Sequence, residues 1–433
     1  MPYFTELSAL FEEVSNWADL RHEQKAKIAP ILARLQKTLA DSKRDLERAN
    51  PASEVSKREP NKLVEIQAVR PKGPRRIGNA MPKDRIQSRM RGAWLGRAAG
   101  CTLGAPVESW TPDAMEDLAR VGKQAFPPTD YWAVHPNPSR VHYNECTFRE
   151  YLKGNLRAVP VDDDLAYTLL GLLILERFGP KFTTKDVGAA WLDHVPMAYT
   201  AEEVALNNLK RGVPAAKAAE IGNPYQEWIG ADIRSDPWGY AAPGWPERAA
   251  EYAYRDAYLS HRYNGIYGEM FFSAAIAAAF VVDSPMEALR IGLTEIPKEC
   301  RLADDLRWAF KRAPRIRDWR EARKVVDERF KGMHHVHTNN NACLTVFGLQ
   351  LGGGDFTKTI GGIVAMGLDN DCTGATAGSI FGAVYGIERI PEHWWKPFGN
   401  GVRSYLKGHK KFTTSDVVKR FLAVARRTWE DAT

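Results

Sequence analysis

The chain has 433 residues, enough for one large domain or for one domain with an appendage. Its composition, 44% hydrophobic and 26% charged, is typical of a soluble globular protein. The 60 basic residues exceed the 53 acidic ones, but most of this excess can be found in one early segment. The net charge of +7 therefore does not indicate a nucleic-acid-binding protein.

The cysteines and the apolar runs give further information on the class of protein. The five cysteines are Cys101, Cys146, Cys300, Cys343 and Cys372. They form no Cys-x-x-Cys pair, so neither a zinc site nor a disulfide framework is indicated, and we expect reduced thiols in a cytoplasmic protein. The first residues lack the basic start and apolar stretch of a signal peptide. The longest apolar run, near 271–282, is too short to span a bilayer, so no membrane partner is expected.

The first 50 residues contain two helical patterns. The apolar residues at helical spacing are Leu7, Leu10, Phe11 and Val14 in the first pattern and Ile28, Ile31, Leu32, Leu35 and Leu39 in the second. They predict an amphipathic helical hairpin over residues 1–50, with charged outer faces. We expect it to pack on the main domain or on a second subunit; docking to another partner is the less favoured interpretation.

Residues 51–85 differ in composition from the hairpin. Prolines at positions 51, 60, 71, 74 and 82 forbid a long helix, and nine lysines and arginines make the segment basic. We expect an extended linker or arm. Wrapping of an acidic surface is favoured over contact with the phosphates of a nucleic acid, which is the alternative.

Two later segments carry a glycine at every fourth residue. One stripe comprises Gly92, Gly96, Gly100 and Gly104, and the other comprises Gly374, Gly378, Gly382 and Gly386. Four residues turn a helix by about 400°, so each stripe stays on one face. Each helical glycine costs about 1 kcal/mol relative to alanine, so four in register indicate a very close neighbouring backbone. We expect the two striped helices to lie against each other in the middle of the domain.

The remaining pattern over residues 86–433 is helical, without convincing strand alternation. We therefore expect an all-α fold: a compact multi-helix orthogonal bundle over 86–433, with the hairpin as an N-terminal appendage. Residues 110–160 are irregular and rich in proline and aromatic residues. A loop of this length inside a compact domain usually serves a purpose such as covering a site.

Two groups of acids each open a helix that the pattern places in the core. Asp162, Asp163 and Asp164 precede a leucine-rich run, and Asp369 and Asp371 precede the second glycine stripe. Capping of a helix needs one aspartate, whereas adjacent carboxylates repel one another by about 4 kcal/mol per pair at an effective dielectric of about 20. Oxygen ligands indicate Mg²⁺, with Mn²⁺ as the alternative, and five converging carboxylates call for two ions.

Two further positions are candidates for a site. Glu108 follows Pro106 on a loop, and by itself it would be an ordinary surface acid. Gly230 and Ala231 could bring backbone N–H groups to a phosphate, although a crossing of two helices is the more ordinary interpretation.

Polar residues before two apolar helices are also candidates for substrate binding. His261, Asn264 and Gly265 lie in a polar, glycine-broken turn, where a site role and a structural role are equally favoured. Asn339 and Asn340 offer amide groups suited to sugar hydroxyls or adenine.

These motifs together resemble the ADP-ribosylglycohydrolases, over roughly residues 88–400. The motifs that carry the resemblance are Gly96 to Glu108, Asp162-Asp163-Asp164, Ser260-His261, and Asp369-Asn370-Asp371-Cys372-Thr373 with its glycine helix. The resemblance implies an all-α fold around a dinuclear Mg²⁺ centre in a cleft. It implies hydrolysis of the glycosidic bond at C1 of the distal ribose of ADP-ribose.

The resemblance also implies roles for single residues. Asp162, Asp163, Asp164, Asp369 and Asp371 would hold the metals, and His261 would line the substrate cleft. Gly230 and Ala231 would lie near the pyrophosphate. Glu108 would lie beside the scissile bond, and Glu108 and Asp163 would serve as the catalytic carboxylates that exchange protons with water or the leaving group.

The chain departs from the family pattern at both metal-binding motifs. The threonine that usually precedes the first acids is replaced by Val161 or Asp162, depending on register. The threonine that usually follows the second pair is replaced by Cys372, with Thr373 one place on. Thiols are poor Mg²⁺ ligands, so either Thr373 acts as the ligand or that ligand is lost.

Three functions are compatible with these observations. The favoured one is Mg²⁺-dependent hydrolysis of the bond between ADP-ribose and an acceptor, which is a protein side chain, a nucleic acid or a small molecule. The second is a ribosyl hydrolase acting on a nucleoside-like metabolite. The third is a non-catalytic family member that binds ADP-ribose.

Overall fold

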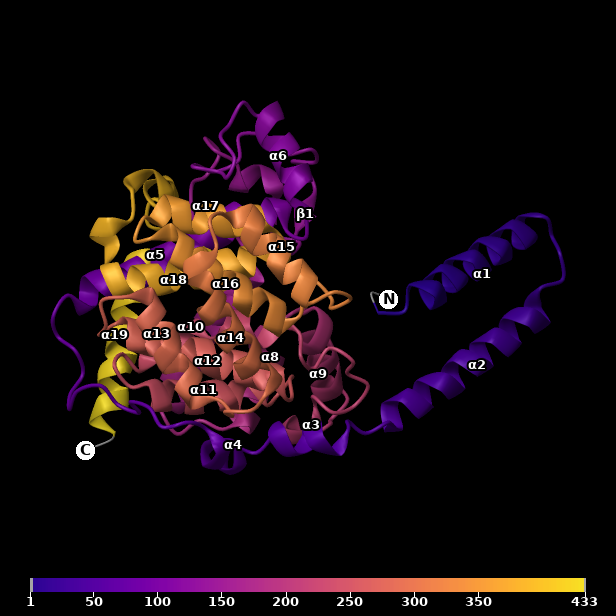
Figure 1. The fold of residues 1–433 in the computed structure, drawn as a ribbon, viewed down its shortest axis with the longest axis horizontal. Helices are drawn as coiled ribbons and strands as arrows, with labels where there is room; N and C mark the ends of the chain where they lie inside the picture. Colours follow the sequence, from indigo (N-terminus) through magenta and orange to yellow (C-terminus); the bar gives the residue numbers. More distant parts are fainter. Residues whose placement is uncertain (1–2, 432–433) are drawn as a thin grey trace.

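The structure, a computed structural model, describes residues 3–431. Figure 1 shows a helical body and, projecting from it, a hairpin formed by the first two helices. The all-α fold expected from the sequence is confirmed, because helices make up nearly all of the regular structure. The N-terminal helices are α1 (Thr5–Glu23), α2 (Ala29–Arg48), α3 (Ser53–Arg58) and α4 (Leu63–Val69).

The helices of the body follow from residue 86 onward. They are α5 (Ile86–Gly104), α6 (Pro112–Val121), α7 (Asp163–Phe178), α8 (Thr184–His194), α9 (Thr200–Lys210), α10 (Asp236–Ala241), α11 (Pro246–Ala257), α12 (Asn264–Ala279), α13 (Pro285–Gly292), α14 (Arg301–Arg312), α15 (Trp319–Arg329), α16 (Thr338–Gly352), α17 (Phe356–Met366), α18 (Asn370–Tyr385) and α19 (Thr414–Glu430).

Two short antiparallel ribbons accompany these helices. Strand β1 (Val141–His142) pairs with β2 (Cys146–Thr147), and β3 (Gly401–Arg403) pairs with β4 (Lys411–Thr413). These strands were not predicted, because two or three residues are too few to show an alternating pattern.

The two glycine-striped helices, α5 and α18, pack against each other along their full length, as the sequence predicts. A Cβ placed on Gly92 would lie 2.7 Å from the carbonyl oxygen of Gly382, and one on Gly100 would collide with the carbonyl of Gly374. The helices run antiparallel, since early glycines of α5 face late glycines of α18. Only glycine permits backbones to come this close, so the stripes specify this pair of helices.

Helix α12 forms a second centre of the body. Every residue in it is buried, and α10, α11 and α13 pack around it. A helix that is apolar all round belongs inside a core. Its one acid, Glu269, is buried with the indole nitrogen of Trp238 donating to it at 2.7 Å. Among residues 3–431, no helix has the length and apolarity needed to cross a membrane.

Residues 51–85 lie on the body, and part of the expected linker or arm is helical, because it includes the short helices α3 and α4. The prolines at 51, 60 and 71 bracket the two helices and limit their length. Glu59, between the helices, is buried. Its carboxylate accepts hydrogen bonds from the guanidinium of Arg301 at 2.8 Å and from the side-chain amide of Asn264 at 3.0 Å. Arg70 and Arg75 both pair with the buried Glu295 (2.6 and 2.8 Å).

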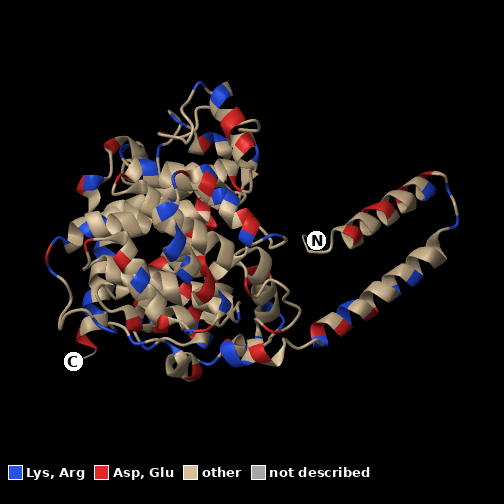
Figure 2. Cartoon of the chain, in the orientation of Figure 1, with Lys and Arg blue, Asp and Glu red and all other residues tan. Residues whose placement is uncertain are grey.

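The hairpin of α1 and α2 stands apart from the body (Figure 1). Neither helix buries a single residue, and Leu7, Leu10, Trp17 and Leu32 are all more than 40% exposed. Figure 2 shows mostly acidic charges on α1 and charges of both signs on α2. The two helices were therefore predicted correctly, but they do not pack on the main domain in the described part of the chain. Packing on a second subunit, the other expectation, stays a prediction.

Candidate metal centre

The first group of acids is positioned by the start of α7. Asp162 caps this helix, since its Oδ1 accepts a hydrogen bond from the backbone N–H of Asp164 at 3.1 Å. Buried Arg97 of α5 reaches the same turn and donates to the carbonyl oxygen of Asp164 (2.8 Å) and to its Oδ1 (3.2 Å). A helix cap and a guanidinium thus fix the three consecutive carboxylates between α5 and α7.

The second group of acids follows a strained turn before α18. Gly367 and Leu368 both have positive φ (70° and 64°). For leucine this conformation costs roughly 1–2 kcal/mol, so surrounding contacts must hold it. Asn341 accepts from the backbone N–H of Asp369 (3.2 Å), and Asn370 donates to the carbonyl of Val107 (3.3 Å). The turn therefore aims Asp369 inward and ties α18 to the segment that carries Glu108.

The antiparallel packing of α5 and α18 brings these acids together. At the end of the glycine stripe, Gly104 contacts the backbone of Asp371. Single oxygens of Glu108, Asp369 and Asp371 lie within 4.8 Å of one another. Oxygens of Asp162, Asp163 and Asp164 do so as well, and Asp164 and Asp371 also share a group with the sulfur of Cys372. Acids that are some two hundred residues apart in the sequence are therefore neighbours.

The proximity of these carboxyls changes their acidity. Burial, the largest cause, and the charge of neighbouring carboxylates raise the pKa values of Asp162, Asp164 and Asp371 well above the usual range. Glu108 has a raised pKa because of desolvation and the charges of Asp369 and Asp163. The pKa of Asp163 rises less, since Tyr143 donates a hydrogen bond to its carboxylate.

The protein itself supplies little positive charge to the cluster. Arg97 contacts Asp164 but also pairs with Asp236 at 2.6 Å, so its charge is shared. His142 lies 3.3 Å from Asp162, but burial lowers its pKa to about 4, so it is neutral near neutral pH. A divalent cation would balance the remaining carboxylates.

Two buried oxygens support a cation at this place. The Oδ1 atoms of Asp369 and Asp371 have no hydrogen-bond partner among residues 3–431, and each side chain is only 4% exposed. Unlike Asp162, Asp369 does not cap its helix with its side chain. Buried carboxylates without partners are unfavourable unless they are protonated or bound to a metal. The donor set fits a divalent ion.

A cavity of about 570 Å³ opens above the acids. This volume lies in the usual range for sites that bind small molecules. Glu108, Asp163, Asp369, Asp371 and Cys372 contribute to its wall, whereas Asp162 and Asp164 lie behind the wall and are buried. The cavity is thus acidic at the place where the two helices begin.

Many of the other lining residues come from residues 110–160, the irregular segment for which the sequence indicated a covering role. The aromatic and basic residues on these walls are Trp110, His135, Arg140, His142, Tyr143, Phe148, Tyr167 and Tyr199. The rings of His135 and Phe148 stack 4.9 Å apart. None of these side chains was predicted individually, although residues 110–160 are rich in aromatic residues.

Three residues predicted to bind substrate do not line this cavity. His261 is fully buried and hydrogen-bonds to Ser260 Oγ at 2.8 Å. Asn264 donates to Glu59 and accepts from the backbone N–H of Leu302 (2.9 Å), so it ties the N-terminal arm to the body. Gly265 packs closely on His261. The polar turn is therefore a structural junction.

The two asparagines of α16 are also structural. Asn339 donates to Asp305 Oδ2 (2.8 Å), and Asn340 donates to the carbonyl of His334 (2.9 Å). Both are buried and lie outside the residues that line the cavity. The sequence favoured site roles because consecutive amides suit sugars, but here they fix the start of a buried helix.

The remaining candidates divide between the cavity and the core. Gly230 lines the cavity, whereas its neighbour Ala231 is fully buried and does not. Thr373 donates its hydroxyl to the carbonyl of Asp369 (3.0 Å) and does not line the cavity. Of this pair, Cys372 lines the cavity, whereas the hydroxyl of Thr373 is used in a hydrogen bond to the backbone.

Comparison with known proteins gives the family. The family model described as ADP-ribosylglycohydrolase matches residues 82–430. No curated protein matches the chain. A solved chain described as "ADP-ribosylglycohydrolase-related protein complex" aligns with a TM-score of 0.53 and 21% identity, over 80% of this chain and 100% of that chain. That likeness supports the fold alone, but the family model spans most of the sequence, and the chain therefore belongs to the ADP-ribosylglycohydrolase family.

Proposed function

We propose that the protein hydrolyses the glycosidic bond between ADP-ribose and an acceptor, with Mg²⁺ as its metal and Mn²⁺ as the alternative. The observation that carries the proposal is that Glu108, Asp163, Asp369 and Asp371 line one cavity, with Asp162 and Asp164 grouped beside them. The volume of the cavity, about 570 Å³, suits a nucleotide-sized ligand.

Two sets of residues would hold the metal ions. Asp369, Asp371 and Glu108 form one set of oxygen donors, and the triad of Asp162, Asp163 and Asp164 forms the other. When bound, the ions supply Lewis acidity, which orients ribose hydroxyls and acidifies water. The orphaned Oδ1 atoms of Asp369 and Asp371 support this assignment, because both are buried and unpaired among the described residues.

Glu108 and Asp163 are the carboxylates suited to proton transfer, because both reach the cavity. Desolvation and the charges of Asp369 and Asp163 raise the pKa of Glu108, which suits it to give a proton to a leaving group when it is not bound to a metal ion. Burial raises the pKa of Asp163, although a hydrogen bond from Tyr143 opposes the rise, and a raised pKa suits a carboxylate that accepts a proton from water. The carboxylates also stabilise positive charge that develops on the sugar.

The walls of the cavity supply the groups that would recognise a dinucleotide-like ligand. The aromatic side chains of Trp110, Phe148 and Tyr199 offer surfaces for a base. Arg140 is the one lysine or arginine among the described lining residues, and it would balance a pyrophosphate charge. The backbone of Gly230 faces the same space and is the remaining part of the predicted phosphate contact.

The test is release of ADP-ribose from a panel of arginine-linked, serine-linked and nucleic-acid-linked substrates, with Mg²⁺, with Mn²⁺ and with chelator. We expect release that requires a divalent ion. Asp371→Asn should lower kcat by at least about 100-fold, since it removes a proposed ligand, and Glu108→Gln should also lower kcat strongly. Asp117→Asn is the matched control, because this exposed aspartate of α6 pairs only with its neighbour Arg120.

The panel also identifies the acceptor, since the substrate released fastest gives the linkage. Release that persists with chelator and in Asp371→Asn would reject the metal-dependent reaction. Binding of ADP-ribose with no release from any substrate would favour the non-catalytic alternative.

A further inference from the structure

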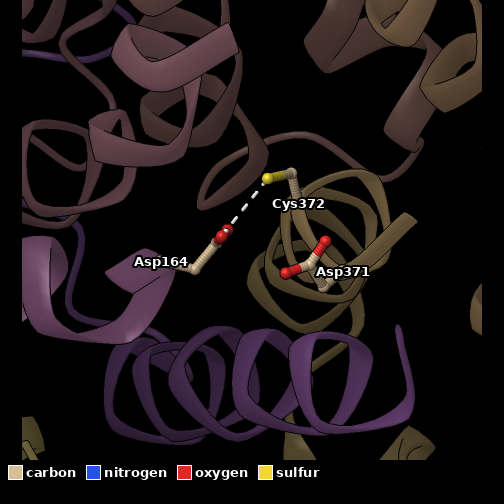
Figure 3. A group of neighbouring side chains, drawn as sticks. All are labelled: Asp164, Asp371 and Cys372. Carbon is tan, nitrogen blue, oxygen red and sulfur yellow. Dashed lines mark hydrogen bonds between the residues drawn. The ribbon is translucent and has the colours of Figure 1, made fainter. Parts of the chain in front are cut away.

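A thiol lies among the acids of the proposed metal centre. Cys372 is in the first turn of α18, and its Sγ lies 3.3 Å from Asp164 Oδ2, to which it donates (Figure 3). The Sγ and single oxygens of Asp164 and Asp371 lie within 4.8 Å of one another. All three side chains are at least nine-tenths buried, so this is an enclosed set of one sulfur and two carboxylates.

The same place contains polar atoms that lack partners. Asp371 contributes an Oδ1 without a hydrogen-bond partner among residues 3–431, and its side chain is 4% exposed. Figure 3 shows the side chains of Asp371 and Cys372 next to each other at the start of α18, with one carboxylate oxygen of Asp371 on the side of Asp164. Asp164 is partly neutralised by Arg97, but Asp371 has no comparable cation in contact. An unpaired buried carboxylate is stabilised either by a proton or by a cation, and the adjacent thiol offers a further ligand for a cation.

The identity of the cation follows from the donor atoms. Mg²⁺ binds oxygen ligands and avoids sulfur, whereas thiolates select zinc, cobalt and iron. A cysteine at this position therefore weakens the case for Mg²⁺ at the ion nearest to it. The neighbouring set of Glu108, Asp369 and Asp371 contains only oxygen donors, so the second ion is not affected by this preference.

We propose that Cys372 is a metal ligand, and that the ion held with Asp164 and Asp371 is a thiophilic first-row ion such as Fe²⁺, Co²⁺ or Zn²⁺. This inference rests on the divalent centre of the proposed function and concerns the ion assigned there to Asp162, Asp163 and Asp164, because Asp164 also belongs to the group with Asp371 and Cys372. On binding, the bond from Sγ to hydrogen is replaced by a bond from Sγ to the metal. The proton leaves to solvent, and no oxidation or reduction takes place.

Cobalt is the probe for this ligand, because a thiolate bound to Co²⁺ gives a charge-transfer absorption band in the near ultraviolet that oxygen ligands do not give. The full-length protein is freed of metal and titrated with Co²⁺. We expect the band in the native protein and its loss in Cys372→Ser. The matched control is Cys146→Ser, a buried cysteine outside every described group of possible metal ligands, which should keep the band.

Metal competition gives a second readout. Cys372→Thr restores an oxygen donor, so we expect its affinity for Co²⁺ or Zn²⁺ to fall by at least about tenfold and the preference to shift toward Mg²⁺. Circular dichroism and thermal unfolding verify that the variants are folded. A measurement that needs no variant is X-ray absorption of the native protein with one equivalent of Zn²⁺, which should show one sulfur at about 2.3 Å.

The outcomes separate this inference from the proposed hydrolysis. A native protein that binds one equivalent of Co²⁺ without the band, or a band that persists in Cys372→Ser, would overturn the ligand role of Cys372. Suppose that ADP-ribose is released with Mg²⁺ alone and that X-ray absorption finds only oxygen or nitrogen ligands around the bound Zn²⁺. These results would overturn the ligand role of Cys372 and leave the proposed function unaffected. A band that depends on Cys372 with no release of ADP-ribose would support the inference and reject the hydrolysis.

Discussion

The helix pair α5–α18 and the hairpin α1–α2 were both predicted from periodic residues, yet the first pair is buried in the body and the second is exposed. Fourteen residues of α5 are buried, as are all residues of α18 except Tyr385, whereas α1 and α2 bury none. Helical period thus identifies a helix in either case. It does not say whether another part of the same chain covers the apolar face.

The two patterns differ in the kind of surface that can pack against them. A glycine stripe can be matched only by another backbone that comes very close, and this chain contains one other such stripe. A leucine stripe is satisfied by any apolar surface of suitable shape. The first pattern therefore specifies its neighbour and the second does not. Substitutions in the two regions should then have very different effects.

The largest effect is expected in the glycine pair. In Gly100→Val the new side chain would overlap the carbonyl of Gly374, so α5 and α18 would have to separate. We expect a loss of about 4 kcal/mol or more in the free energy of unfolding, or failure to fold, measured by urea unfolding. The control is Gly362→Ala in α17, where no atom lies within 4 Å, and which should be neutral or stabilising by up to about 1 kcal/mol. Equal effects of the two substitutions would contradict the close packing.

The second effect concerns pH and the acids at the end of the glycine pair. The pKa values of Asp162, Asp164, Asp371 and Glu108 are raised in the folded state, so the folded protein binds more protons than the unfolded one above the ordinary carboxyl range. Stability of the metal-free protein should therefore fall as pH rises from about 5 toward 8. Thermal unfolding with and without Mg²⁺ measures this.

Added metal should remove most of that dependence, because it replaces protons as the balancing charge. Asp371→Asn removes one of the repelling carboxylates, so its metal-free form should lose less stability over the same range of pH. A metal-free native protein whose melting temperature rises with pH would contradict the raised pKa values.

An intermediate effect is expected where the N-terminal arm attaches. Glu59→Ala removes the buried carboxylate that binds Arg301 and Asn264, and we expect a loss of about 2 kcal/mol in the free energy of unfolding. Glu54→Ala, an exposed position in α3, is the control and should change stability little. No difference between the two variants would mean that the arm does not contribute to the stability of the body.

The smallest effect is expected in the hairpin. Leu10→Gln and Leu32→Gln replace exposed side chains, so each should change the free energy of unfolding of the body by less than about 0.5 kcal/mol. Leu103→Ala in α5, which is fully buried, should cost about 2–5 kcal/mol and serves as the comparison. A large loss in either hairpin variant would show that these side chains are covered in solution.

The acids of the candidate site could be found from sequence alone because they form local motifs. Asp162 to Asp164, and Asp369 with Asp371, could be found as acids that open buried helices, and the glycine stripes predicted which helices meet. His261, Asn264, Asn339 and Asn340 were also predicted to bind substrate, but they do not line the cavity. A polar residue before an apolar helix looks the same whether it faces a ligand or a distant segment such as the one carrying Glu59.

The sequence by itself determined the helical class, the pairing of α5 with α18 and the identity of the acids, because period, glycine spacing and charge are properties of neighbouring residues. Only the tertiary structure decided that Cys372, and not Thr373, lies beside Asp164, and that the walls of the cavity come from Arg140, Tyr143 and their neighbours. Such choices depend on the rotation of a helix and the path of an irregular loop. Those are set by packing between residues far apart in the chain, which no local pattern records.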